Sequence, residues 1–294
     1  MRRKGFTLVE LLVVIAIIAL LMGILMPALA RVRQLAYRLY CGTNLSGIGK
    51  AMLIYSNDYD DEMPRAGGRS STYSPTIANW QNVTRQVAFG LAADGSGGRA
   101  NITSCFYLLI KYSEVTPKSF LCKGDSGVTE FKGSEHGLTG AELIDLWDFG
   151  PAPTQAHCSY AYHFPYGVYA LTSSSEPGMA VAADANPWQA TPGQTARAVL
   201  DWNSFKAGTD RESIKKGNAQ AHQEDGQNVL FMDGHSVFEK TPRCGVNDDN
   251  IYTRWVAGTP PDKRNGTYPV SLVDPVDRTD SFLVTDGAVT TITH

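Results

Sequence analysis

Residues 11–26, which read LLVVIAIIALLMGILM, contain no charged and no hydrogen-bonding side chain. Together with residues 27–30 they form a 20-residue segment. As a helix this segment is about 30 Å long, close to the thickness of the hydrocarbon core of a bilayer. A helix that is apolar on every side has no polar face to turn to water. The segment therefore predicts either a membrane-spanning helix or a cleaved export signal.

Charge is unevenly distributed along the 294 residues, which have a formal net charge of −3. The first 50 residues contain seven Lys or Arg side chains and one acid, Glu10, so the rest of the chain carries −9. This acidic balance argues against general nucleic-acid binding. A hydrophobic content of 43% excludes a wholly disordered chain. The sequence therefore predicts a basic, apolar N-terminal segment joined to an acidic globular part.

The export-signal alternative has its own support. Residues 2–4 are basic, and Ala28-Leu29-Ala30 has the small-x-small form of a signal-peptidase site. The apolar run is, however, longer than the usual core of a signal peptide, which spans about 7–15 residues. On this alternative the protein is a secreted binding protein or hydrolase that begins at Arg31.

Glu10 stands at the start of the apolar run, where a carboxylate is costly in lipid unless it is paired. The segment Lys4-Gly5-Phe6-Thr7-Leu8-Val9-Glu10 and the run after it resemble the class III leader of type IV pilins and type II secretion pseudopilins. The resemblance implies that a prepilin peptidase cuts after Gly5 and methylates the new amine of Phe6. Glu10 becomes the fifth mature residue, and Pro27 becomes the 22nd, where many pilins have a helix-kinking proline.

The same resemblance implies a domain organisation and a location. Residues 1–5 would be the leader, 6–30 a single transmembrane helix in the inner membrane, and 31–62 its soluble half. Residues 63–294 would be an exported β-rich domain in the periplasm or on the cell surface. The implied partners are the prepilin peptidase, other pilin-like subunits, an inner-membrane assembly platform and the lipid bilayer. Within a filament, Glu10 would pair with the terminal amine of a neighbouring subunit and set the register.

Beyond the apolar run, hydrophobic residues recur at helical spacing. The stripe comprises Cys41, Leu45, Ile48, Met52 and Tyr55. The sequence therefore predicts one long helix over about 6–56, with a bend or break near Gly42. Later apolar segments predict a helix at 104–112 and strands at 120–122, 159–162 and 179–182. The predicted fold class is α+β and pilin-like, with a small antiparallel sheet packed on the helix and long loops.

The clearest local pattern lies at residues 228–239, where Asp233-Gly234 separates two apolar-rich runs. Asp-Gly favours a two-residue hairpin turn, because both central positions of a type I′ turn need positive φ. Pairing outward from this turn predicts Leu230 opposite Val237 and Val229 opposite Phe238. Both faces of the hairpin are apolar, so we expect it to be largely buried.

This hairpin extends the family resemblance. His222, followed by Asp233-Gly234, is similar to the processing-associated H-x9-D-G domain of pilin-like proteins in planctomycete-type bacteria, with a spacing one residue longer. Four other stretches are similar to the same family: residues 41–45, 55–64, 120–122 and 246–252. The resemblance implies an anchored, pseudopilin-like subunit.

Candidate metal sites are few. Asp248-Asp249-Asn250 offers the clustered carboxylate and amide oxygens that Ca²⁺ prefers, so calcium is the one cofactor that the sequence suggests. His222, Asp225, Asp233 and His235 could be drawn as a transition-metal site, but we expect structural roles for the histidines and a turn role for Asp233. The chain has no G-x-S-x-G, H-E-x-x-H or phosphate-loop motif. We therefore expect no catalytic activity.

Five cysteines in an exported domain permit up to two disulfides. They are Cys41, Cys105, Cys122, Cys158 and Cys244. Cys41 lies on the apolar helix stripe and is expected to be a buried free thiol. The preferred disulfide is Cys122–Cys158.

Overall fold

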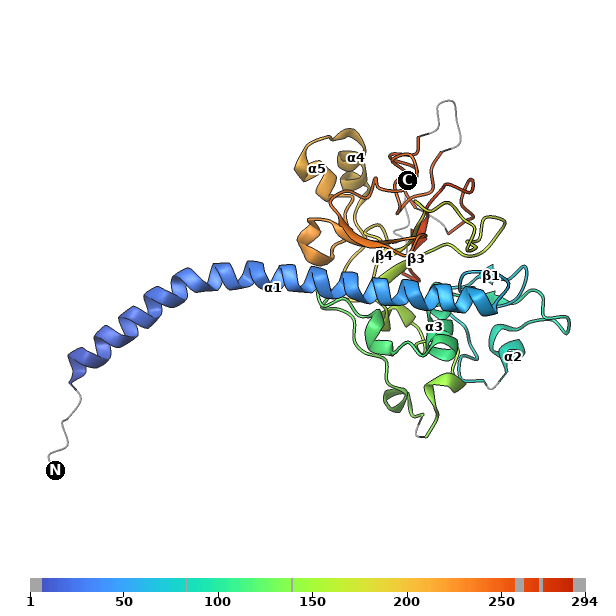
Figure 1. The fold of residues 1–294 in the computed structure, drawn as a ribbon, viewed down its shortest axis with the longest axis horizontal. Coiled ribbons are helices and arrows are strands. Elements are labelled where there is room, and N and C mark those ends of the chain that lie inside the picture. Colours follow the sequence, from blue (N-terminus) through green and yellow to red (C-terminus); the bar gives the residue numbers. More distant parts are fainter. Residues whose placement is uncertain (1–6, 83, 139, 257–261, 270–271, 288–294) are drawn as a thin grey trace.

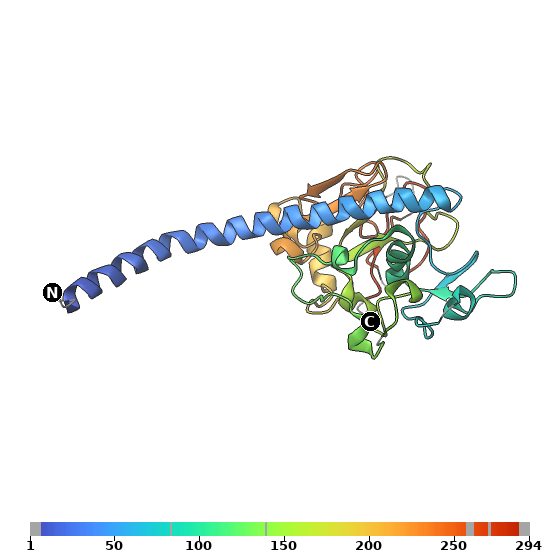
Figure 2. The same ribbon diagram turned by 60° about the horizontal axis from the view of Figure 1, so that its bottom comes forward.

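The first helix dominates the shape of the molecule. The computed structural model describes residues 7–82, 84–138, 140–256, 262–269 and 272–287. Helix α1 spans Leu8–Asp58 without interruption, so the predicted long helix is confirmed. Its N-terminal half projects away from the globular part and curves, whereas its C-terminal half lies along the globular part (Figure 1). The turned view shows the same separation into a bare half and a packed half (Figure 2).

The packed half of α1 uses the predicted apolar stripe. Its five residues, from Cys41 to Tyr55, are all buried. The predicted break near Gly42 is wrong, because α1 continues through it. Gly42 instead allows close packing: a Cβ there would lie 3.0 Å from Oδ1 of Asn228 in the sheet. The missing side chain therefore permits close approach of helix and sheet rather than a bend.

One antiparallel sheet forms the centre of the domain, in the strand order β6-β5-β4-β3-β7. The strands are β3 (Tyr160–His163), β4 (Ala180–Asp184), β5 (Gln227–Phe231), β6 (Ser236–Glu239) and β7 (Leu283–Val284). The predicted strands at 159–162 and 179–182 correspond to β3 and β4. Helix α1 contacts β5 and β6 of this sheet and also α3. The α+β class with a small antiparallel sheet is confirmed.

The two faces of the sheet belong to different hydrophobic cores. Tyr160, Tyr162 and Leu230 lie in the core that contains the α1 stripe. Alternate residues on the strands, such as Ala161 and Val229, lie in a second core. This second core also contains the aromatic residues Trp188, Trp202, Phe205, Tyr252 and Tyr268. Because both faces are covered, β5 is buried at every position.

The remaining elements are short. They are β1 (Thr72–Tyr73), α2 (Arg85–Phe89), β2 (Arg99–Ala100), α3 (Ile102–Ser113), α4 (Val199–Ala207), α5 (Arg211–Lys215) and five 3₁₀ turns, η1 (Pro117–Phe120), η2 (Gly133–His136), η3 (Leu143–Asp145), η4 (Thr154–His157) and η5 (Ala221–Glu224). Helix α3 confirms the predicted helix at 104–112. The predicted strand at 120–122 is wrong: η1 includes Phe120, and the N–H of Leu121 donates back to the carbonyl of Lys118.

The β5–β6 hairpin is present, but its predicted register is wrong by one residue. Val229 pairs with Val237 and Leu230 pairs with Ser236. The N–H of Phe231 donates to the carbonyl of His235, which closes a three-residue loop that ends with Gly234 at φ 86°. A turn followed by a left-handed glycine is the usual three-residue alternative to the two-residue turn. Edge strand β6 is also more exposed than predicted, because it pairs on one side only.

Two glycines of α1 provide a matched test of the helix–sheet contact. Gly47 is exposed, and a Cβ there would meet nothing within 4 Å, whereas a Cβ on Gly49 would lie 2.6 Å from Cδ1 of Leu230. Alanine is favoured over glycine in a helix by about 1 kcal/mol. We therefore expect Gly47→Ala to raise the free energy of unfolding by up to that amount.

We expect Gly49→Ala to lose this gain and to destabilise the protein, because Leu230 must move away from the new methyl group. Denaturant unfolding of the full chain in detergent micelles measures both changes. Equal stabilisation by the two variants would contradict the packing of Gly49 on Leu230.

Candidate functional site

The N-terminal half of α1 is bare among the described residues. Its large apolar side chains are exposed from Leu8 through Leu39. The most apolar window of the helix has a mean hydropathy of 3.1, and none of it is buried. By length and composition, α1 can cross a membrane, and it fits a single-pass membrane anchor.

Glu10 lies at the exposed end of this helix and is bound locally. Its carboxylate accepts hydrogen bonds from the N–H of Thr7 (2.9 Å) and from Thr7 Oγ1 (2.7 Å). The N–H of Glu10 donates to Thr7 Oγ1 in return, which completes a capping box at the start of α1. The predicted processing residues, Gly5 and Phe6, lie outside the described residues. Within the single chain, Glu10 therefore satisfies the helix terminus.

Pro27 lies inside α1, which continues past it. Proline has no N–H, so the carbonyl of Gly23 one turn earlier receives no helical hydrogen bond from this position. The half of α1 that contains Pro27 is the curved half in both views (Figures 1 and 2).

A second candidate site lies where α1 meets the sheet, and a disulfide marks it. Cys41 of α1 is bonded to Cys122, which lies 81 residues later in the chain. The predicted Cys122–Cys158 pair is therefore wrong, and so is the expectation of a free thiol at Cys41. Cys158 is a buried free cysteine. Cys41 faces the domain because it is on the packed stripe, which places its sulfur against the loop after η1.

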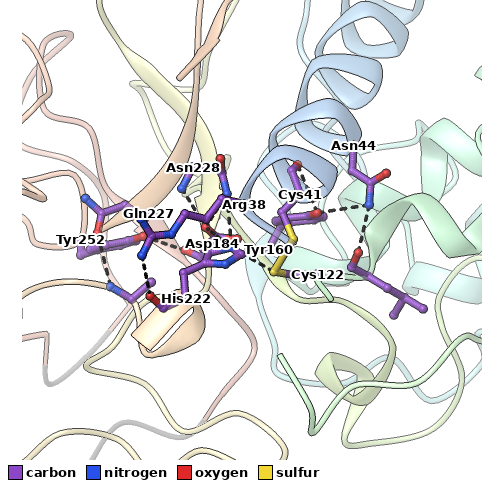
Figure 3. Close-up of polar contacts among 12 residues, drawn as sticks. Arg38, Cys41, Asn44, Cys122, Tyr160, Asp184, His222, Gln227, Asn228 and Tyr252 are labelled. Atoms are coloured by element: carbon purple, nitrogen blue, oxygen red, sulfur yellow. Dashed lines mark hydrogen bonds and ion pairs between the residues drawn. A yellow bond between two sulfur atoms is a disulfide. The ribbon is translucent and has the colours of Figure 1, made fainter. Parts of the chain in front are cut away.

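Asn44, one helical turn after Cys41, binds the loop after η1 through its side-chain amide. Nδ2 of Asn44 donates to the carbonyl of Leu121 (2.9 Å), and the Tyr160 hydroxyl donates to the carbonyl of Cys41 (3.4 Å). Figure 3 shows these contacts beside the disulfide. Cys41 and Asn44 thus tie residues 121–122 to α1 from one side of the helix.

His222 lies directly beside the disulfide. Its Nε2 is 3.3 Å from Sγ of Cys122 and 3.4 Å from Oδ2 of Asp184, and all three side chains are buried. Asn228 completes the cluster: its main-chain N–H donates to Asp184 Oδ2 (2.7 Å), and its side chain reaches Nε2 of His222 (3.3 Å). Asp184 is the last residue of β4 and Asn228 is the second residue of the adjacent strand β5, and both lie on the sheet face toward α1 (Figure 3).

The backbone that carries His222 is unusual. His222, Gln223 and Glu224 have φ values of 56°, 61° and 61°, so three consecutive non-glycine residues are left-handed. Each such residue costs roughly 1–2 kcal/mol, so the surrounding contacts must hold this conformation. Gly124 makes room for the ring, because a Cβ there would lie 2.8 Å from its Nδ1.

An outer layer of charged and aromatic groups covers His222. Nη2 of Arg38 donates to the His222 carbonyl (3.4 Å) and to Oδ2 of Asp225 (2.7 Å). The Arg38 guanidinium also stacks on Phe238, 4.6 Å from the ring centre, and Phe238 packs edge-on against His222. Asp225 is half-buried, and its desolvation by itself would raise its pKa, but hydrogen bonds from Arg38 and Arg211 outweigh this effect and lower the pKa. Arg38 thus connects the membrane-proximal part of α1 to this cluster.

The other predicted motif residues lie elsewhere. His222 precedes β5 and Asp233-Gly234 follow it, so they occupy opposite ends of that strand. Asp233 is exposed and accepts a hydrogen bond from the N–H of His235 (3.1 Å) in the hairpin loop. The motif therefore contains His222, which is buried beside the disulfide, and a hairpin turn at the other end of β5. These two parts do not form one site.

The predicted calcium ligands have different partners. Asp248 is exposed and lies 3.8 Å from Arg264. Asp249 is buried, and its Oδ2 accepts from the N–H of Ser281 (2.7 Å); burial and the nearby Asp280 raise its pKa well above the usual range. Oδ1 of Asn250 accepts from the N–H of Tyr252 (3.1 Å). These contacts give Asp249 and Asn250 roles in the loop, and calcium binding stays a prediction.

Sequence patterns identify His222, Cys41 and Cys122 one at a time, without placing them together, and they do not identify Asp184. Asp184 is one acid among many in the sequence, and only strand pairing brings it beside Asn228. Because Cys41 belongs to the apolar stripe, the sequence alone predicts that a cysteine of α1 faces the domain.

Residues 1–26 match the family model described as the prokaryotic N-terminal methylation motif. No curated protein and no solved structure was found to match the chain. The motif indicates a precursor of the type IV pilin or pseudopilin kind, and the single apolar helix after it fits the membrane anchor of such a protein.

Proposed function

We propose that this protein is a pilin-like (pseudopilin) structural subunit. A prepilin peptidase cuts it after Gly5 and methylates Phe6, and α1 then anchors it in the inner membrane. Its outer domain, of the processing-associated H-x9-D-G kind, lies in the periplasm or on the cell surface. With an assembly platform and other subunits, it builds a pilus or a type II secretion pseudopilus. Its role is assembly rather than catalysis.

The unequal burial of α1 is the observation that supports this proposal most directly. Residues 8–30 of the helix are exposed and, apart from Glu10, carry no charge, whereas the stripe from Cys41 to Tyr55 is buried. Lipid covers such a surface in the anchored subunit. Because lipid tails are as apolar as leucine side chains, the same surface can exchange lipid for neighbouring helices at little hydrophobic cost. One helix can therefore serve as a membrane anchor first and as part of a filament core later.

Glu10 supplies the specificity that an apolar surface lacks. Cleavage after Gly5 creates a cationic amine at Phe6, about one helical turn from Glu10. A carboxylate in lipid is costly unless it is paired, and the bonds from Thr7 satisfy it without neutralising its charge. Pairing with the amine of a neighbouring subunit would neutralise that charge only at the correct stagger, so the pair would set register more than stability.

Mass spectrometry of the mature N-terminus tests the processing step. We expect the chain to begin with N-methylated Phe6. A mature chain that begins at Arg31 would contradict the proposal and support a secreted protein with a cleaved signal peptide.

The assembly role of Glu10 predicts different outcomes for two neighbouring substitutions. Glu10→Ala removes the charge and is expected to preserve membrane insertion and processing but to reduce incorporation into filaments at least tenfold. Thr7→Ala removes the hydroxyl of the capping box and keeps the carboxylate, so it should assemble normally. Quantitative immunoblotting of sheared filament and membrane fractions measures both.

Equal impairment by Thr7→Ala and Glu10→Ala would show that the helix cap matters and not the intersubunit pair. Normal assembly of Glu10→Ala would remove the pairing argument. A wild-type chain that is processed but remains as single subunits would instead support an anchored protein that does not polymerise.

A further inference from the structure

Four side chains with metal-binding atoms converge at the junction of α1 and the sheet. They are Cys41, Cys122, Asp184 and His222, and one ligand atom from each lies within 4.8 Å of all the others. All four residues are buried. They come from α1, the loop after η1, β4 and η5, so the complete tertiary structure is needed to bring them together (Figure 3).

The spacing of these atoms fits ligands around one ion. With zinc bonds of about 2.0–2.3 Å, tetrahedral ligands lie about 3.4 Å apart for a nitrogen and an oxygen, and about 3.6 Å apart for a nitrogen and a sulfur. The observed separations from His222 Nε2 are 3.4 Å to Asp184 Oδ2 and 3.3 Å to Cys122 Sγ. The distance to Asp184 exceeds the 2.7–2.9 Å of a charge-assisted hydrogen bond. His222 and Asp184 therefore approach each other without the close contact of a bonded pair.

Asp184 has further capacity for a ligand. Its Oδ1 is buried and has no hydrogen-bond partner among the residues that the structure describes. A buried carboxylate oxygen without a partner is costly, and a cation coordinated by both oxygens of Asp184 would remove that cost. The left-handed backbone of residues 222–224 carries the imidazole of His222 at this site. A strained segment kept around a buried histidine is typical of a functional position.

The donor set determines the class of ion. Two thiolates, an imidazole and a carboxylate suit zinc, which takes four such ligands in closed structural sites. A disulfide cannot serve in this way, because the thiolate is the metal ligand. Reduction would let the two sulfurs separate to about 3.8 Å, the spacing of two thiolates on one tetrahedral zinc ion.

We propose that the dithiol form of Cys41 and Cys122, with His222 and Asp184, binds a zinc ion, so that metal and disulfide are alternative cross-links between α1 and the domain. An external dithiol breaks the Cys41–Cys122 bond by thiol–disulfide exchange: it supplies two electrons and two protons and is itself oxidised to a disulfide. Zinc then displaces the two thiol protons to solvent without changing its oxidation state. Either cross-link joins Cys41 to Cys122, and the zinc ion would add Asp184 and His222. This proposal does not depend on the proposed role in filaments.

Metal analysis of the full chain in detergent micelles tests this proposal. The protein is reduced with a phosphine, incubated with zinc or cobalt(II), and freed of excess metal by gel filtration. We expect stoichiometric zinc in the reduced chain and none in the oxidised chain. The cobalt form should show thiolate-to-cobalt charge-transfer absorption. A reduced, folded chain that retains no zinc, or a cobalt form without thiolate bands, would overturn the proposal.

Variants separate this site from other cysteines and histidines. His222→Ala and Cys41→Ser should lose zinc retention, whereas Cys244→Ser and His235→Ala should keep it. Because His222 is buried, circular dichroism must first show that its variant is folded. Alkylation of the reduced wild-type chain gives a readout that needs no variant: zinc should protect Cys41 and Cys122 and leave the labelling of Cys244 unchanged. Equal labelling of Cys41 with and without zinc would contradict the proposal.

Discussion

Replacing Cys41 with alanine is expected to lower the free energy of unfolding by about 4.5 kcal/mol when the wild-type protein is oxidised. The Cys41–Cys122 disulfide closes a loop with a sequence separation of 81 residues, and a cross-link over so long a loop removes much chain entropy from the unfolded state. It also holds α1 against the domain at the point where the helix leaves its bare half. Denaturant unfolding of the full chain in detergent micelles with a chelator measures this loss.

Cys158→Ala is the matched control for this measurement. Cys158 is buried like Cys41 but is a free thiol, so the substitution removes a similar volume without removing a cross-link. We expect a cost of about 1 kcal/mol, typical of losing a small buried group. A large loss at Cys158 with little loss at Cys41 would contradict the disulfide and restore the pairing that the sequence predicted.

The stability of the protein is also expected to fall as pH rises from 4 to 7. Asp148 is fully buried, and burial, followed by the nearby charge of Asp286, raises its pKa from 3.8 to about 7. Burial likewise raises the pKa of Asp286 to about 6. Both carboxyls lie near the start of α3, where Asp286 accepts from the N–H groups of Ile102 and Thr103, each at 2.8 Å.

The sign of this pH effect follows from proton binding. Between the pKa of about 3.8 in the unfolded chain and about 7 in the folded chain, the folded state binds more protons at Asp148. Stability is therefore highest below the unfolded pKa and is lost as pH rises through the folded pKa. The shift corresponds to about 4 kcal/mol for Asp148 alone. Unfolding free energies measured at several pH values check the predicted fall.

Two substitutions identify the source of the pH effect. Asp148→Asn should make the fall between pH 4 and 7 smaller, because the residue can no longer ionise, and should leave the part that Asp286 causes. Asp94→Asn is the control: Asp94 is exposed, and hydrogen bonds from the Ser96 side chain and main chain lower its pKa. The fall between pH 4 and 7 should persist in that variant. An unchanged profile in Asp148→Asn would show that other groups cause the dependence.

Patterns within short stretches of sequence predicted the two longest helices and four of the five strands of the central sheet, but none of the other short elements. The apolar run and the stripe after it predicted α1, and apolar segments predicted α3, β3 and β4. These predictions depend on a periodicity that each segment carries by itself. The hairpin register failed because Asp-Gly is compatible with turns of two or three residues, and strand pairing selected the three-residue loop.

The composition and order of residues by themselves determined the N-terminal part of this protein: a methylation motif, an apolar helix and an acidic domain after it. These features depend on residues that are adjacent in the chain or one helical turn apart. Only the tertiary structure decided the partner of Cys41, the position of Asp184 beside His222, and the use of Gly42 for close packing. The disulfide joins residues 81 positions apart, and all three contacts depend on how α1 and the loops pack on the sheet. Local patterns cannot specify such contacts, because the packing of one whole element on another determines them.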